Sequence, residues 1–327
     1  MLKLKLNQPS RFLAFCSLLA LIGALGSVSP LKAQNATAPA NATAPASATV
    51  APTPERTMTA QEFLDGLNKE VENGNPQAMV ALGAIIQNAD TNSRNYGKAL
   101  ELFQKAAAKG SPEGYYQVGA AYEVGQGTRT DLTKAIQNFQ KASELGSKEA
   151  DFKLSQFYLL GVGVPQDLPK GLASLNASAK AGFPPAINEL GVLYVLGQGG
   201  VAKDEKKAFD YFNQAAQASY SEAMLNLAVI YRDGLGRPIN NVQALKWFIL
   251  AATYGSQTPG LRESVIAVQE KLKPTEVATA EKEATAWRND QIKKAQEAQQ
   301  KAQEAQQKAQ PKAPADKAAQ PATNVKK

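Results

Sequence analysis

The sequence repeats itself five times with a period of 36 or 37 residues, and this repetition limits what the chain can fold into. The units span residues 75–110, 111–146, 147–182, 183–219 and 220–255. A large apolar or aromatic residue returns at the twelfth position of every unit, as Ile86, Tyr122, Tyr158, Tyr194 and Tyr231. A unit this short cannot bury its apolar face alone, so successive copies must stack on one another. The repeat therefore predicts a solenoid.

Each unit carries the signals of two helices joined by a glycine turn. The first helix starts at an N-cap residue followed by proline, as in Ser111-Pro112, and it ends at a Gly-x-Gly turn such as residues 197–199. The second helix restarts at an aspartate whose carboxylate can accept from the free N–H groups of the first turn: Asp131, Asp167 and Asp204. We expect an all-α fold, a right-handed α/α superhelical solenoid of five repeats with helical caps.

Three units place a glycine inside the first helix, at Gly83, Gly119 and Gly191. Glycine in a helix interior costs about 1 kcal/mol relative to alanine. Its return at one position predicts that a neighbouring helix packs against the bare backbone there.

Helical caps are expected because a terminal repeat would otherwise expose its packing face. Residues 58–74 form the predicted N-terminal capping helix, and residues 256–292 form two C-terminal capping helices separated by Pro274. Residues 293–327 are rich in Ala, Lys and Gln. Their alanines recur at three- and four-residue spacing, which favours an isolated helix over a coiled coil because alanine buries little area. From Pro311 the tail is expected to be disordered.

The first 33 residues have the pattern of a secretory signal peptide. Lys3, Lys5 and Arg11 precede an apolar run over residues 12–28, and Ala33 closes a cleavage site. An uncleaved membrane anchor is the alternative, although the run is short for a bilayer span of about 20 residues. Residues 34–57 are an Ala/Pro/Thr-rich linker, predicted to be disordered. We expect a bacterial periplasmic or secreted protein that meets a membrane only through this segment before cleavage.

The composition lacks the side chains that catalysis and metal binding most often use. Cys16, inside the signal segment, is the only cysteine, and the chain has no histidine, so a cysteine nucleophile, the commonest general base and the commonest metal ligand are missing. We expect no catalytic residue, no cofactor and no metal site. Residues 34–287 carry 23 basic and 25 acidic side chains, which gives no basic face for nucleic acid.

The repeat register resembles the Sel-one-like repeat family, which is related to tetratricopeptide repeats. The fourth unit shows the shared residues best: Ala186, Leu190, Gly191, Tyr194, Gly197, Gly199, Asp204, Lys207 and Ala208. The first unit departs at Ala89 and Thr91, and the fifth at Asn240 and Gln243. The resemblance implies an α/α superhelix that binds protein partners, commonly as an adaptor or regulator in signalling, envelope biology or host contact.

If tetratricopeptide geometry carries over, the sixth and seventh positions of the units point to the concave side. The predicted partner-binding residues are Tyr116, Gln117, Phe152, Lys153, Asn188, Glu189, Leu225 and Asn226. An alternative interpretation is that Tyr116, Phe152 and Leu225 only pack between repeats.

The functional hypothesis is an exported, non-catalytic adaptor or scaffold that holds a protein or peptide on its concave face. Two alternatives stay open. The Ala/Lys-rich tail could tether a structural protein to the envelope. A cell-wall hydrolase that uses only carboxylates is the other, since glycoside hydrolysis needs two acids a few ångströms apart.

Overall fold

A computed structural model describes residues 59–89 and 94–309 of the protein, with side chains up to residue 305. In these ranges every regular element is an α-helix. The predicted signal peptide (1–33), the linker (34–57) and the tail beyond residue 309 lie outside the described residues.

Every unit contains two helices. The first helices of the five units are α3 (Pro76–Gln87), α5 (Pro112–Val124), α7 (Lys148–Leu160), α9 (Pro184–Leu196) and α11 (Ser221–Asp233). The second helices are α4 (Tyr96–Ala108), α6 (Leu132–Glu144), α8 (Leu168–Lys180), α10 (Glu205–Gln217) and α12 (Asn241–Thr253). Each helix packs against the next along the chain.

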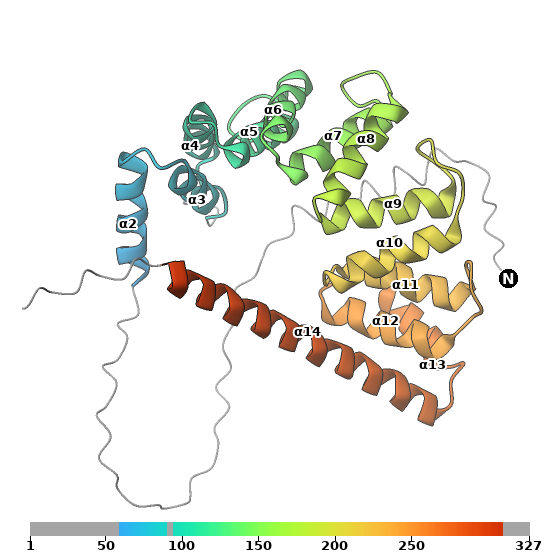
Figure 1. Cartoon of the computed structure of the whole chain (residues 1–327). Coiled ribbons are helices and arrows are strands. Elements are labelled where there is room, and N and C mark those ends of the chain that lie inside the picture. The colour runs from blue at the N-terminus through green and yellow to red at the C-terminus, as the bar shows by residue number, and fades with distance from the viewer. Residues whose placement is uncertain (1–58, 90–93, 310–327) are drawn as a thin grey trace, which may run out of the picture.

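The repeat helices follow one another along an arc, in which α3 and α5 lie on the inner side and α4 and α6 on the outer side (Figure 1). Burial agrees with this arrangement. Apart from their end residues, α5, α7, α9 and α11 have no exposed side chain, whereas α6, α8 and α10 expose side chains at every turn. The prediction of an all-α solenoid of five repeats is confirmed.

The polar residues before the second helices are caps. The Asp204 carboxylate accepts from the backbone N–H of Lys207 at 2.9 Å, and the Asp204 N–H donates to the Tyr194 carbonyl at 2.8 Å. An equivalent side-chain cap starts each of the other second helices, at Asn95, Asp131, Asp167 and Asn240. These bonds satisfy N–H groups that a helix start leaves free.

The glycines inside the first helices make room for a ring. A Cβ added at Gly191 would lie 2.6 Å from Cε1 of Phe212, which is fully buried on the second helix of the same unit. The same relationship holds for Gly83 with Phe103 and for Gly119 with Phe139. The expected neighbour at the bare backbone is therefore the partner helix of the unit, whose ring fills the core.

Helices cover both ends of the stack. Helix α2 (Ala60–Glu72) starts at a capping box formed by Thr59 and Glu62 and packs on α3. At the other end α13 (Leu261–Gln269) and α14 (Pro274–Ala309) pack on α12.

Helix α14 has a packed half and a free half. Trp287 lies edge-on to Trp247 and Tyr254, at 5.8 and 5.6 Å between ring centroids. Gln291 still reaches Gln217 on α10, at 3.3 Å. Residues 292–305 are all exposed. The second capping helix was expected to end near residue 292, but α14 has no break there and runs into the tail.

Candidate partner-binding face

The eight residues predicted to bind a partner lie two by two on α5, α7, α9 and α11. We call them the inner row: Tyr116, Gln117, Phe152, Lys153, Asn188, Glu189, Leu225 and Asn226. Asn188 is buried and the other seven are half-buried. The row is thus neither core nor freely exposed surface.

The aromatic members also support the fold. Tyr116 lies 5.5 Å from Phe139 of α6, between ring centroids. Phe152 lies edge-on to Phe183, the first residue of the next unit, at 5.5 Å. Tyr116 therefore packs against its own repeat, and Phe152 packs against the next repeat. The packing of Phe152 is of the kind that the alternative interpretation described.

Lys153 already has a partner. Its Nζ lies 2.9 Å from Oε2 and 3.1 Å from Oε1 of Glu123, which lies on the preceding unit. The two side chains are 23% and 14% exposed, so this ion pair is shielded far more than a surface pair. Gln117 is engaged as well, because its Nε2 donates to Glu113 at 2.6 Å.

The two asparagines are bonded to each other across units. Asn226 Nδ2 on α11 donates to Asn188 Oδ1 on α9 at 2.9 Å. Their other amide atoms, Asn188 Nδ2 and Asn226 Oδ1, have no hydrogen-bond partner among the described residues. One donor and one acceptor are therefore left at the inner row.

Glu189 differs from Lys153, the other charged member of the row. Its carboxylate has no hydrogen bond or ion pair with any described residue. Burial raises the pKa of the Glu189 carboxyl to about 7, because removal from water disfavours the charged form. Keeping an ionised carboxylate away from water without a partner lowers the free energy of unfolding.

Several carboxylates lie near two tyrosines of the inner side. Burial raises the pKa of the Tyr116 hydroxyl to about 12, and three carboxylates act in the same direction: Glu123, Glu113 and Glu149. Burial also raises the pKa of Tyr220, with Glu222 and Glu189 the next causes. Sequence reasoning missed most of these acids. Three of them, Glu113, Glu149 and Glu222, stand at the third position of their units. This recurrence, one helical turn before the predicted binding residues, could have indicated them.

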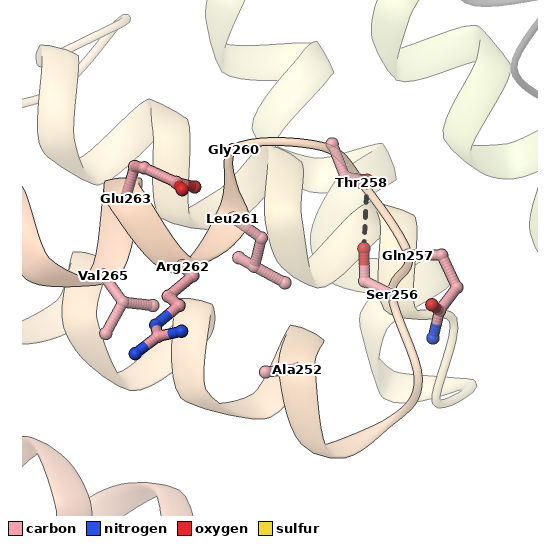
Figure 2. Close-up of a pocket in the computed structure, with 9 residues that line it drawn as sticks. All are labelled: Ala252, Ser256, Gln257, Thr258, Gly260, Leu261, Arg262, Glu263 and Val265. Carbon is pink, nitrogen blue, oxygen red and sulfur yellow. Dashed lines mark hydrogen bonds between the residues drawn. The ribbon is translucent and has the colours of Figure 1, made fainter.

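A separate open pocket of about 430 Å³ lies between the end of α12 and the start of α13. Figure 2 shows Leu261 pointing toward Ala252, with Arg262 beside Val265. The Ser256 and Thr258 hydroxyls are hydrogen-bonded to each other at 3.0 Å. The lining has one carboxylate, Glu263, so the pocket offers neither an activated nucleophile nor a pair of acids.

Over residues 59–89 and 94–309, no cluster of three or more His, Cys, Asp or Glu side chains could hold a metal ion. Within the same stretch, no helix combines the length and the apolar character needed to cross a membrane.

The model of the Sel1 repeat family matches five consecutive segments: residues 76–111, 112–147, 148–183, 184–220 and 221–256. Together they cover more than half of the chain. The chain belongs to the Sel1 repeat family. Each match begins one residue after the unit predicted from the sequence, so the repeat register is nearly the same. Sel1 repeats generally serve as scaffolds for protein interaction.

Solved structures share this Sel1 repeat architecture. A protective antigen present in uropathogenic Escherichia coli strains, with an SLR fold, has a TM-score of 0.63 and 26% identity over 83% of this chain and 54% of its own. A Sel1 repeat protein from Oxalobacter formigenes has a TM-score of 0.56 and 27% identity over 64% of this chain and 60% of its own. The chain thus spans less than two thirds of either protein. No curated protein matches it significantly.

Proposed function

We propose that this Sel1 repeat protein is an exported scaffold that holds a polypeptide partner along its inner face. The main support is the contrast between the twelfth position of the units and the inner row. The twelfth position is tyrosine in four units, but the seventh position reads Gln117, Lys153, Glu189 and Asn226. A surface that only packed repeats together would be expected to repeat with them. A different side chain in each unit suits one extended partner whose residues differ along its length.

Capture by matched photoreactive residues tests this proposal. Gln117 on the inner side of α5 and Gln214, exposed on the outer side of α10, are each replaced by benzoylphenylalanine in producing cells. Irradiation is expected to attach one defined protein through position 117 and not through position 214. Equal attachment through both positions, or attachment through position 214 alone, would contradict an inner binding face.

Export is the second part of the proposal. It is supported by the signal-like pattern of residues 1–33. Residues 1–57 fused to alkaline phosphatase, which folds actively only outside the cytoplasm, are expected to give activity and a mature N-terminus at Gln34. A retained Met1 would instead indicate a membrane anchor.

Tethering through the tail is a second candidate function, and the exposed second half of α14 supports it. Truncation after Gln291 separates the two functions and keeps the bond from Gln291 to Gln217. A scaffold keeps its partner after this truncation. If the tail is a tether, the truncated chain loses its position in the envelope, whereas a scaffold that does not use the tail keeps both its position and its partner.

A further inference from the structure

One acidic side chain of the inner row, Glu189, has no hydrogen bond or ion pair with the described residues. Lys153 is neutralised by Glu123 at 2.9 Å, and Glu113 accepts from Gln117. Glu189 alone has no described partner. Half-buried charges without a partner are unfavourable in an isolated protein, which indicates that the partner is supplied from outside.

The charges around Glu189 indicate whether the external partner is a cation or an anion. Glu222 acts with Glu189 in raising the pKa of Tyr220, so a second negative charge is near. The one cation of the inner row, Lys153, is held by Glu123. Glu222 accepts from the Ser221 hydroxyl at 3.0 Å, so Glu189 is the acid of the two that lacks a partner. An incoming cation would be attracted by both carboxylates, whereas an anion would be repelled.

The neighbouring asparagines determine the kind of molecule. Asn188 directly precedes Glu189 on α9. Asn188 Nδ2 and Asn226 Oδ1 offer one donor and one acceptor, which matches the C=O and N–H of an extended backbone. Phe183, at the start of the same unit, and Phe152, on the preceding unit, add apolar surface. These groups together suit a peptide segment rather than a free metal ion or polyamine.

We propose that Glu189 receives a lysine or arginine side chain of the polypeptide partner, whose backbone lies against Asn188 and Asn226. This inference rests on the proposed function and adds the chemistry of the bound segment. Charge-assisted hydrogen bonds to a carboxylate are about twice as strong as neutral ones. Losing the carboxylate is therefore expected to weaken binding at least tenfold.

Carbon-13 NMR of glutamate carboxyl groups in the full chain tests the inference directly. The probes are acetyl-Ala-Lys-Ala-amide, its arginine analogue and its glutamine analogue, and the Glu189 resonance is assigned with Glu189→Gln. The lysine and arginine probes are expected to shift that resonance, with dissociation constants at least tenfold below that of the glutamine probe. Equal affinity for the glutamine probe would overturn the proposal.

Two variants complete the test. Glu189→Gln is expected to remove the preference for the cationic probes. Glu144→Gln, which changes an exposed carboxylate on α6, is expected to leave it unchanged. Equal loss in both variants would overturn the assignment. If the probes do not bind at Glu189 while benzoylphenylalanine at position 117 still captures a protein, this inference fails and the proposed function stands.

The lysines of residues 310–327 are a competing source of cations. Deleting this segment is expected to change probe affinity less than twofold. A tenfold gain on deletion would show that the chain's own lysines occupy Glu189, and would overturn an external partner.

Discussion

Gly191 and Phe212 share one space: a Cβ at position 191 would lie 2.6 Å from Cε1 of the buried ring. The two residues lie on α9 and α10, so this contact sets how closely the two helices of the unit approach. Gly191→Ala should force the ring away, and overpacking of this kind costs about 1–3 kcal/mol. The better helix propensity of alanine offsets about 1 kcal/mol. Urea titration is expected to show a net loss of up to about 2 kcal/mol.

Gly66→Ala is the matched control for that substitution. Gly66 lies inside α2, and a Cβ there would meet nothing within 4 Å. Only the propensity gain remains, so the unfolding midpoint should rise or stay unchanged. A similar loss in both variants would show that Phe212 does not limit position 191.

Ser219 has the only positive φ of a non-glycine residue in the described chain, at 60°. Four units end in glycine in the same conformation, among them Gly182 with φ 76°. A side chain in the left-handed region costs about 1–2 kcal/mol. Ser219→Gly is therefore expected to raise the free energy of unfolding by about 1 kcal/mol, measured by urea titration. The reciprocal change Gly182→Ser should lower it, and no difference between the two would count against strain at Ser219.

Glu189 gives stability a characteristic pH dependence. Its folded pKa is about 7 and its reference value is 4.5, so the folded state binds the proton more tightly than the unfolded state. The free energy of unfolding should therefore fall as pH rises from about 4.5 to about 7, by at most about 3 kcal/mol.

Comparison with Glu189→Gln isolates this effect, because the amide does not titrate. The difference in unfolding free energy between the variant and the natural chain should grow over that pH range in favour of the variant. A difference that is constant from pH 4 to pH 8 would mean that the Glu189 carboxyl is solvated like an ordinary surface acid.

The Lys153–Glu123 pair should matter for stability. Lys153→Met leaves the Glu123 carboxylate, 14% exposed, without its cation, and an unpaired group of this kind costs about 1–3 kcal/mol. The control is Lys141→Met on α6, because Lys141 and Glu144 are 60% and 62% exposed and such pairs contribute little. Thermal unfolding should separate the two variants, and equal midpoints would contradict a structural role for the shielded pair.

The repeat units and their caps could be predicted because the signals are local. Asp204 caps the backbone N–H of Lys207, only three residues further on. The glycine of the first helix recurs 20 or 21 residues before the buried phenylalanine of the same unit. The pairing of the inner row could not be predicted in this way. Lys153 and Glu123 are 30 residues apart, and their contact depends on how closely adjacent units are stacked.

The C-terminal end shows a different limit. The sequence offered Pro274 as a start for the last helix but no stop signal at residue 292. The next proline is Pro311, and the intervening residues are good helix formers. Helix α14 accordingly continues to Ala309. Packing ends near Gln291 although the helix does not, and only the structure shows this difference.

Hydrogen exchange of the full chain, with and without the protein captured through position 117, tests the central claim most directly. A partner on the inner face should slow amide exchange in α5, α7, α9 and α11 and leave the outer helices α6, α8 and α10 unchanged. Slowing confined to the outer helices or to the free half of α14 would contradict the claim.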